Sequence, residues 1–228
     1  MKAIIHLHSK YSFDCFTSPE KLVDMAIENN IDVLCITDHD TIQGSVHAQK
    51  YAQKRYGDAL KVIIGAEYKT DYGDIIGLNL KEEIQLTKAE DVIQAIKKQG
   101  GLVLLPHPFV SHKNIEYLAQ QSDLIEIFNA RSSSNANEAA TELAKSLNKP
   151  QYVSSDAHFL TDADLCINTF DVKKSMPFEI ALLQADRAFT TGFSSKKHYF
   201  NSQMIGGLKK RNMRMLFSAM KNWVFFKQ

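Results

Sequence analysis

The sequence predicts an α/β protein whose β-sheet is mostly parallel. Two observations predict this fold class. Short apolar runs rich in β-branched residues recur along the chain, and most are continuous, as expected of strands buried on both faces. Segments with apolar residues at helical spacing lie between these runs, and strands that alternate with helices indicate βαβ units. The pattern leaves open whether the sheet closes into a barrel.

The strand-like runs are spread over the first two thirds of the chain. Six of them share the apolar, β-branched character: residues 3–7, 33–37, 62–65, 102–105, 124–128 and 152–154. Residues 74–80 are a further candidate, and they could pair with the 62–65 strand as a local hairpin.

Helices are expected between the strands. Ser18 and Pro19 supply an N-cap and a proline at the first helical position, which predicts a helix to about residue 29. Residues 45–56 and 88–98 are expected to form two more, the second ending at Gly100-Gly101. Residues 135–147 give the clearest pattern, because their alanines and leucines form one apolar stripe at helical spacing.

Length and composition exclude several other classes of protein. The 228 residues fit one large domain. A composition of 44% hydrophobic and 23% charged residues excludes wholesale disorder. No run approaches the roughly 18 apolar residues that span a bilayer. The first residues lead directly into a strand, so we expect no signal peptide. Cys15, Cys35 and Cys166 form no CxxC pair, and this odd, scattered set favours reduced thiols in a cytoplasmic protein.

Histidines and carboxylates gather at the predicted strand ends. Five of the eight histidines lie there: His6, His8, His39, His107 and His158. Carboxylates accompany them: Asp14, Asp38, Glu67 and Asp156. An isolated histidine is more often a surface or hydrogen-bonded structural residue. Five at strand ends are hard to attribute to chance, and in a closed (β/α) barrel the chemistry sits at these ends.

The spacing of these residues suits a metal site. His6 and His8 are two apart on a strand, so both rings should project from one face. Imidazole and carboxylate ligands suit Zn²⁺, Mn²⁺ or Fe²⁺, and the absence of clustered thiols argues against a purely structural zinc. Eight candidate ligands exceed the four that one tetrahedral ion takes, so we expect two or three divalent ions. The candidates are His6, His8, Asp14, His39, Glu67, His107, Asp156 and His158.

Six short motifs occur in a fixed order along the chain. They are His6-Leu7-His8-Ser9, Ser12-Phe13-Asp14, Ile36-Thr37-Asp38-His39-Asp40-Thr41-Ile42, Gly65-Ala66-Glu67, Pro106-His107-Pro108 and Ser155-Asp156-Ala157-His158. Together they resemble the PHP (polymerase and histidinol phosphatase) family of metal-dependent phosphoesterases. The resemblance covers roughly residues 1–170 and is closest to the small stand-alone members of the family.

The resemblance implies a distorted (β/α)7 TIM-like barrel with metals in its mouth. On the family's pattern His6, His8, Glu67 and Asp156 would hold one buried ion, with Asp156 and His158 as catalytic residues. His39, His107 and His158 would serve neighbouring ions, and Glu67 would bridge. Asp14 stands where the family usually supplies His or Asp. Asn129 stands where the family often has His, and this departure favours two ions over three.

Other residues are candidates for substrate contacts. Arg131 follows the 124–128 strand and could bind a phosphate through its guanidinium fork, or it could pair at the surface with Glu138 or solvent. His112 and Lys113 lie on the loop after His107 and could also touch substrate. Asp38 and Asp40 could orient the imidazoles or cap the following helix.

The C-terminal part of the chain has a different charge. From Arg187 onward there are nine basic and no acidic residues, while the first 186 residues hold 18 basic and 26 acidic groups, a net charge of −8. We expect a catalytic domain over 1–195 and a basic amphipathic helical extension over 196–228, with an apolar stripe at Met213, Leu216, Phe217, Met220, Trp223 and Val224. This stripe could pack on the barrel or a twin subunit, lie on an anionic membrane surface, or meet nucleic acid.

These observations predict a metal-dependent phosphoesterase that hydrolyses a phosphomonoester, of a nucleotide or another small phosphate ester, by a metal-bridging hydroxide. Two alternatives stay open. One is a nuclease whose basic extension grips the phosphate backbone, which predicts a steep dependence on salt. The other is a non-catalytic metal-binding module whose extension recruits a partner. The sequence does not set the oligomeric state.

Overall fold

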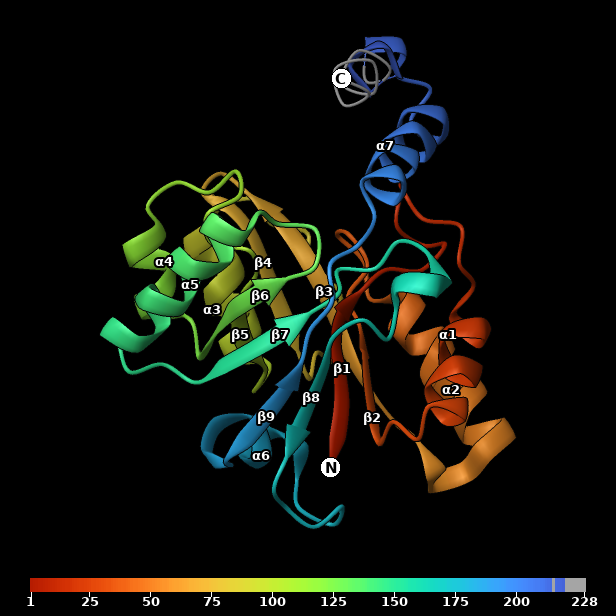
Figure 1. Cartoon of the computed structure of the whole chain (residues 1–228), viewed down its shortest axis with the longest axis vertical. Helices are drawn as coiled ribbons and strands as arrows, with labels where there is room; N and C mark the ends of the chain where they lie inside the picture. Colours follow the sequence, from red (N-terminus) through yellow and green to blue (C-terminus); the bar gives the residue numbers. More distant parts are fainter. Residues whose placement is uncertain (215, 220–228) are drawn as a thin grey trace.

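A computed structural model describes residues 1–214 and 216–219 of the chain. Within them, nine strands form one sheet in the order β7-β6-β5-β4-β3-β2-β1-β8-β9, with helices on its outer side (Figure 1). The strands are β1 (Lys2–Leu7), β2 (Val33–Ile36), β3 (Lys61–Thr70), β4 (Gly73–Leu78), β5 (Leu102–Leu105), β6 (Leu124–Asn129), β7 (Gln151–Ser154), β8 (Ile167–Phe170) and β9 (Arg187–Thr190). The α/β class and the order of the predicted strands are therefore confirmed.

Seven strands, β1 to β7, curve into a nearly closed barrel. β1, β2 and β3 run parallel, and so do β5, β6 and β7. β4 is antiparallel to both of its neighbours, which confirms the local hairpin with β3. β7 and β1, the two edges of this seven-stranded part, meet just beyond β7, where Ala157 bridges Leu7 of β1 and the Ala157 carbonyl accepts from the His8 amide at 2.9 Å. This closure at the carboxyl ends defines the mouth of the barrel.

A buried side chain fills the remaining gap between β7 and β1. Asn168 of β8 is fully buried. Its Oδ1 accepts from the Val153 amide (3.0 Å), and its Nδ2 donates to the Val153 carbonyl (2.9 Å). The amide side chain thus satisfies backbone groups that a complete strand pairing would otherwise satisfy. β8 pairs antiparallel with the first residues of β1, and β9 pairs antiparallel with β8.

Seven α-helices of the described residues lie around the barrel and over its ends. They are α1 (Pro19–Glu28), α2 (Gln43–Tyr56), α3 (Ala89–Lys98), α4 (Ile115–Gln121), α5 (Ser134–Ser146), α6 (Phe178–Gln184) and α7 (Lys196–Lys209). α1 and α2 lie on one side, and α3, α4 and α5 on the other (Figure 1). α1 begins as predicted, because the Ser18 hydroxyl accepts from the Lys21 amide and Pro19 opens the helix. The three cysteines are buried and unpaired.

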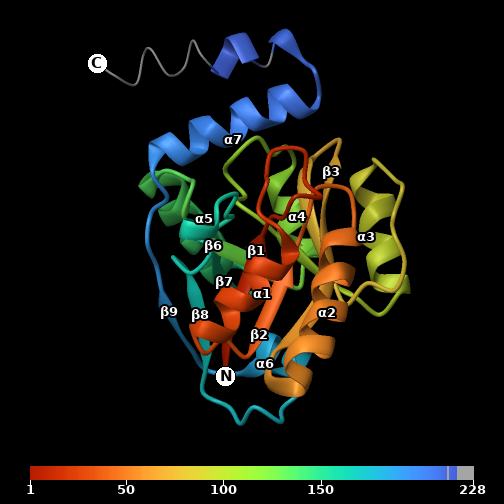
Figure 2. The ribbon, with the colours of Figure 1, turned by 90° about the vertical axis from the view of Figure 1, so that its right-hand side faces the viewer.

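α7 lies across the barrel mouth, at the end opposite the N-terminus (Figure 2). Ser195 caps its first turn by accepting from the His198 amide. The chain then turns back, so that a Cβ added to Gly207 would lie 2.7 Å from Leu216 Cδ2. Of the predicted apolar stripe, Met220, Trp223 and Val224 lie outside the described residues. None of the described helices is long and apolar enough to cross a membrane.

Candidate metal centre

All eight predicted metal ligands lie at the barrel mouth. His6 belongs to β1 and Glu67 to β3, while the others follow a strand or precede α1: His8, Asp14, His39, His107, Asp156 and His158. Backbone pairing continues past the end of β2, since the Asp40 amide donates to the Glu67 carbonyl at 2.8 Å. This extension sets His39 beside Glu67. The structure therefore brings the predicted residues into one cluster.

Three ligand candidates have a left-handed backbone. The φ angles of His6, His107 and Asp156 are 64°, 28° and 47°. At His6 the pairing of β1 with β2 shifts by one residue, so simple strand alternation is not what directs His6 and His8 toward each other. Such conformations are costly for residues other than glycine and concentrate at functional sites.

Glu67 occupies the middle of the cluster. Its Oε1 lies 3.4 Å from His6 Nε2 and 3.1 Å from His107 Nε2, and its Oε2 lies 3.0 Å from His39 Nδ1 and 3.5 Å from His8 Nε2. Asp156 also approaches His6 and His8. Its Oδ1 lies 3.5 Å from His6 Nε2 and 3.1 Å from His8 Nε2. The two oxygens of the Glu67 carboxylate are thus placed so that they could bridge neighbouring ions.

A second group lies toward the opening. Asp14 Oδ2 lies 3.4 Å from His39 Nε2 and 3.0 Å from His158 Nε2. The Phe13 ring stacks on the His39 ring with their centroids 4.8 Å apart. The Asp14 carboxylate therefore lies beside two other predicted ligands, as the sequence led us to expect.

The donor atoms are spaced as metal ligands would be. Zinc or manganese holds nitrogen and oxygen ligands at about 2.0–2.2 Å, which leaves neighbouring ligand atoms roughly 3–4 Å apart. Among the described residues, four overlapping groups of three donors lie within 4.8 Å: His8, His39 and His158; His6, His8 and Glu67; His6, His107 and Asp156; Glu67, Asp74 and His107. Buried His6 Nε2, His107 Nδ1 and Asp14 Oδ1 have no hydrogen-bond partner. His6 Nε2 faces the Glu67 and Asp156 carboxylates, and a buried nitrogen without a hydrogen bond at this position fits a divalent ion.

Protonation of the cluster follows from these contacts. Burial opposes a charge on His6, but the carboxylates of Asp156, Glu67 and Glu126 outweigh it and hold the pKa of His6 well above its ordinary value. Burial likewise opposes a charge on His107, yet the hydrogen bond and charge of Glu67 raise its pKa to about 9. For His8, burial together with the nearby His158 and His39 lowers the pKa to about 3. Protons thus balance the carboxylates when no cation does.

Glu126 and Asn129 of β6 support the cluster, and sequence reasoning missed the role of both. Glu126 is buried, its Oε1 lies 3.0 Å from His6 Nδ1, and its Oε2 accepts from the His107 amide at 2.6 Å. Asn129 Nδ2 donates to Glu126 Oε2 (3.0 Å) and to Asp156 Oδ2 (3.4 Å). Residues behind metal ligands fix their orientation. A carboxylate inside an otherwise apolar strand was the signal that could have identified Glu126.

Asp38 organises the loop that follows β1. It is buried, and its carboxylate accepts from the Ser9 amide and hydroxyl, both at 2.6 Å, and from the Ser12 hydroxyl at 2.7 Å. The Ser12 hydroxyl in turn lies 3.0 Å from His8 Nδ1. Asp40 accepts from the Lys69 amide instead, and α2 has no side-chain cap. Asp38 therefore does not cap the following helix. The structure supports the other alternative, in which Asp38 positions His8 through the Ser12 hydroxyl.

Arg131 lies at the edge of the cavity that the cluster faces. This cavity has a volume of about 220 Å³, and its lining includes Asp156, His158 and Tyr199. Arg131 Nη1 contacts the His158 ring and lies 3.6 Å from Asp156 Oδ1, and Nη2 donates to Ser202 Oγ of α7 at 2.9 Å. No contact with Glu138, the surface alternative, is found at this arginine in the described structure. Its position suits an oxyanion inside the cavity.

His112 and Lys113 lie away from the cavity lining. Both ring nitrogens of His112 meet backbone carbonyls, those of Val110 (2.8 Å) and Asp74 (2.9 Å). Lys113 is exposed, and its amide donates to the Tyr72 carbonyl. The structure therefore gives His112 a place in holding the loop against β4, and a substrate contact from either residue stays a prediction.

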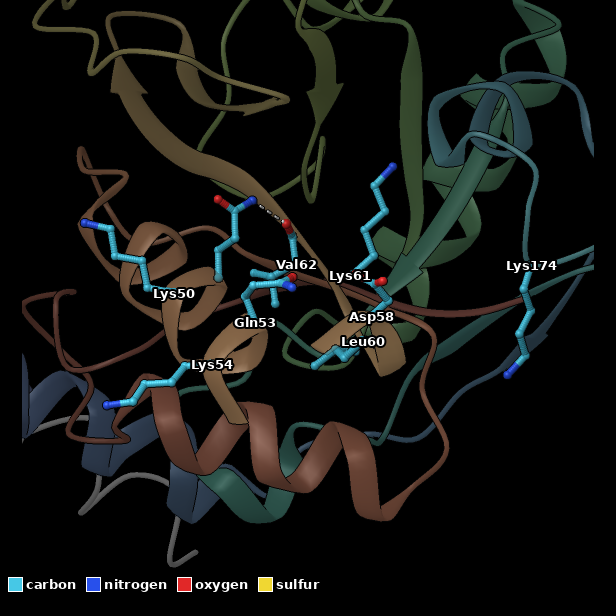
Figure 3. Close-up of a pocket in the computed structure, with 9 residues that line it drawn as sticks. Lys50, Gln53, Lys54, Asp58, Leu60, Lys61, Val62 and Lys174 are labelled. Atoms are coloured by element: carbon cyan, nitrogen blue, oxygen red, sulfur yellow. Dashed lines mark hydrogen bonds between the residues drawn. The ribbon is translucent and has the colours of Figure 1, made fainter. Parts of the chain in front are cut away.

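A larger cavity of about 780 Å³ lies away from the mouth, between α2 and the start of β3. Figure 3 shows four lysines around it, Lys50, Lys54, Lys61 and Lys174, whose amino groups point in different directions. Lys61 lies 3.7 Å from the Glu179 carboxylate and Lys174 lies 2.5 Å from that of Asp32. Because these amino groups do not converge on one point, the four lysines do not form a binding cluster like the one at the mouth.

Comparison with known proteins identifies the family. The model of the PHP domain matches residues 5–158, a span that begins in β1 and ends at the last predicted ligand. The chain belongs to the PHP domain family. The resemblance seen in the six motifs is therefore confirmed.

Curated relatives of this PHP domain protein include two archaeal proteins. Uncharacterized protein MJ1587 of Methanocaldococcus jannaschii is 40% identical over 120 residues, which are 48% of this chain and 68% of that protein. Uncharacterized protein MJ0417 of the same organism is 31% identical over 173 residues, 70% of this chain and 66% of that protein. The 5'-3' exoribonuclease Rnm of Escherichia coli is 39% identical over 80 residues, only 33% of this chain and 27% of Rnm.

Solved structures share the fold. A two-domain protein of Bacteroides vulgatus, described as containing a predicted PHP-like metal-dependent phosphoesterase, superposes with a TM-score of 0.71 at 20% identity and covers 84% of this chain. This chain covers 65% of that protein, just under two thirds of its length. PsfC of Pseudomonas syringae superposes with a TM-score of 0.63 at 14% identity, over 92% of this chain and 98% of its own. These likenesses support the barrel architecture.

Proposed function

We propose that this protein is a metal-dependent phosphoesterase that hydrolyses a phosphomonoester, of a nucleotide or another small phosphate ester. The observation that carries the proposal is the cluster of eight ligand candidates around Glu67, six of which line a cavity bordered by Arg131. Membership of the PHP domain family supports the same class of reaction.

The proposed cofactor is two or three divalent ions, Mn²⁺, Zn²⁺ or Fe²⁺. His6, His8, Glu67 and Asp156 would hold one ion, and Asp14, His39, His107 and His158 would complete the neighbouring sites. When bound, such ions make water a hydroxide nucleophile at neutral pH and neutralise charge on the phosphoryl oxygens. The Asn129 side chain donates a hydrogen bond to Asp156 and offers no imidazole nitrogen to a metal, which favours two ions over three.

The protein's own side chains would position the phosphate. Arg131 offers a guanidinium fork that matches two phosphoryl oxygens, and its contact with Ser202 fixes the plane of the fork. Asp156 and His158 line the same cavity beside Arg131, and we assign them the catalytic positions. Asp14 at 3.0 Å holds the His158 ring in place. His112 and Lys113 remain proposed outer contacts for a larger substrate.

A panel of phosphate monoesters tests this proposal. Purified protein loaded with Mn²⁺ or Zn²⁺ should release phosphate from at least one ester. His8→Ala and Asp156→Ala should each lower kcat/KM by about a hundredfold or more, because each removes a ligand candidate. His47→Ala is the matched control, since His47 pairs with Glu20 outside the cluster. Metal bound at full stoichiometry without turnover of any ester would instead support a non-catalytic metal-binding module.

A nuclease is the second candidate. Two observations favour it: the partial similarity to an exoribonuclease, and the position of α7 over the barrel mouth (Figure 2), where the Lys209 amino group donates to the Ser12 carbonyl. If the basic extension grips a phosphate backbone, RNA hydrolysis should fall steeply with salt, and Lys210→Gln should reduce the slope by about one. An absence of RNA hydrolysis at 50 mM salt, or the same slope in both proteins, contradicts this version.

The three buried, unpaired cysteines support the further proposal of a cytoplasmic location, because nothing in their arrangement uses an oxidising compartment.

A further inference from the structure

A second cavity adjoins the metal centre. Its volume is about 510 Å³, which falls in the range of small-molecule sites. It shares four lining residues with the cavity of the cluster: Val110, Arg131, Ser132 and Tyr199. The two cavities therefore meet around Arg131, and a ligand held at the cluster can extend into the second space.

The walls of the second cavity differ from those of the first. It lies between the first turns of α5 and α7, and its lining has aromatic rings, five serines, Gln203 and two cationic residues, Arg131 and Lys196. No Asp or Glu appears among its described lining residues, whereas Asp14, Glu67, Asp74 and Asp156 line the cavity of the cluster. The first space suits cations and phosphate, and the second suits an uncharged or electron-rich group.

Aromatic surface faces this space without a partner that covers it fully. Phe193 is 54% exposed and Tyr199 is 42% exposed, although both line a concave surface. Phe193 leans on the Phe128 ring, with centroids 5.0 Å apart. The Arg131 guanidinium lies 5.0 Å from the centroid of the Tyr199 ring. Exposed rings in a cavity beside a catalytic centre indicate contacts with a ligand, and such rings stack on planar groups.

Arg131 gives the ligand its direction. Metal-ligand candidates line the inner side of the first cavity. The ester substituent of a phosphate held beside Arg131 therefore has an open path toward the second cavity. We propose that this cavity is a leaving-group subsite for a planar aromatic or heteroaromatic ring. The substrate would then be the phosphomonoester of a ring-bearing alcohol. This inference rests on the proposed phosphoesterase function for the placement of the phosphate.

The reaction itself is simple hydrolysis. The P–O bond to the ring-bearing alcohol breaks, water supplies the oxygen of the new P–O bond, and one proton of that water ends on the released alcohol. No oxidant, reductant or further co-reactant is needed.

Binding of phosphonates tests the subsite separately from catalysis, because their C–P bond is not hydrolysed. By titration calorimetry of the Mn²⁺-loaded protein, phenylphosphonate should bind about tenfold more tightly than methylphosphonate, as expected for one stacked ring. Phe193→Ala should remove most of that difference. Phe109→Ala is the control, since Phe109 is 42% exposed on a nearby loop but lines neither cavity. Equal affinities in the wild-type protein, or an unchanged ratio in Phe193→Ala, would overturn the subsite.

Turnover then distinguishes the sources of the ring. We would compare kcat/KM for benzyl phosphate, adenosine 5'-phosphate and glycerol 2-phosphate, because all three release an alcohol of similar acidity. A preference for either ring-bearing ester over the glycerol ester supports the subsite, and the better of the two identifies an aryl or a nucleoside group. Glycerol phosphate hydrolysed as well as both would contradict it. If no ester is hydrolysed while phenylphosphonate keeps its advantage, the proposed reaction fails and the ring subsite stands.

Discussion

Glu126 holds two histidines of the cluster at once. Its carboxylate lies 3.0 Å from His6 Nδ1 and accepts from the His107 amide at 2.6 Å, so it sets both the ring of His6 and the backbone that presents His107. A histidine whose Nδ1 donates to a carboxylate presents Nε2 as its metal-binding nitrogen. The buried and unpartnered His6 Nε2 has this orientation.

Glu126→Gln therefore should weaken metal binding without removing a ligand. We expect the Kd for Mn²⁺ or Zn²⁺ to rise about 10- to 100-fold, because the neutral amide no longer orients and polarises His6. Competition with a chelator of known affinity measures this change. Glu142→Gln on the exposed face of α5 is the matched control. An unchanged Kd in Glu126→Gln would show that its contacts do not tune the site.

Protons should leave the protein when metal binds. In the metal-free state the pKa of His107 is raised to about 9 by Glu67, so its ring carries a proton at pH 7.5, and the pKa values of His6 and His39 are raised in the same direction. A metal needs their neutral nitrogens, so affinity should rise with pH until about pH 9. Calorimetry in buffers of different ionisation enthalpy should detect release of at least one proton per chain at pH 7.5. Binding with no proton release contradicts this protonation pattern.

Single residues differ in how far the sequence could predict them. The eight ligand candidates were predictable because parallel strand ends share one edge, and their residue types are rare at so many strand ends by chance. The His6 backbone was not, since a φ of 64° depends on the shifted pairing of β1 with β2. The pairing of Asp38 with Ser9 and Ser12 also depends on tertiary structure, which brings residues 26 to 29 apart in sequence together.

At the scale of elements, α7 ties two sides of the barrel mouth together. At its middle, the Ser202 hydroxyl accepts from Arg131, which follows β6. At its end, Lys209 Nζ donates to the carbonyls of Lys10, Ser12 and Cys15, in the loop that carries Asp14. The Lys210 ammonium lies 3.3 Å from the centroid of the Phe13 ring, which stacks on His39. Part of the basic charge of the C-terminal segment thus holds the loop of the metal centre.

Lys209→Met should loosen this loop. Three carbonyls lose their charged donor, but much of the amino group is exposed, so we expect about 1 kcal/mol and a Tm lower by about 2–4 °C. Thermal unfolding followed by circular dichroism measures the shift. Lys197→Met, on an exposed position of the same helix, should leave the Tm within about 1 °C. Equal shifts for the two variants would remove the proposed role of Lys209.

Asn168 is the corresponding support for barrel closure. Asn168→Ala should destabilise the protein by about 2–4 kcal/mol, because the buried amide and carbonyl of Val153 lose their partner. Chemical denaturation gives the free energy of unfolding. Thr169→Ala, the neighbour in β8, is the control. A loss no larger than that of the control would show that the gap between β7 and β1 closes without this side chain.

The elements that the sequence predicted best were those with one clear period. The strands of the barrel read as buried apolar runs, and residues 135–147 read as a helix that the structure gives as Ser134–Ser146. β8 alternates buried with half-buried residues and β9 half-buried with exposed ones, over only four positions each, which is too few to stand out. α7 falls within the helical extension expected over residues 196–228, but the apolar stripe that suggested this extension begins at Met213, beyond the end of α7, which has no single apolar stripe of its own.

At the scale of the whole molecule, a formal net charge of +1 combines two unlike parts. The first 186 residues have a net charge of −8, and part of this charge is the buried cluster of carboxylates at the barrel mouth. Bound divalent ions would offset much of it, and the folded chain brings basic α7 over the same end (Figure 2). Burying like charges this closely requires counter-charge, supplied by protons or by metal. Metal loading should accordingly raise the Tm of the protein.

Elemental analysis of the wild-type protein tests the central claim most directly. Protein purified without chelator, or reconstituted with Mn²⁺ or Zn²⁺ and desalted, should hold two or three metal equivalents per chain, and Asp156→Ala should hold at least one fewer. Because the cluster is buried and its donors are spaced for ions, this result follows if the mouth of the barrel is a metal centre. Less than half an equivalent in the reconstituted wild-type protein, with no rise in Tm on adding metal, would contradict the account.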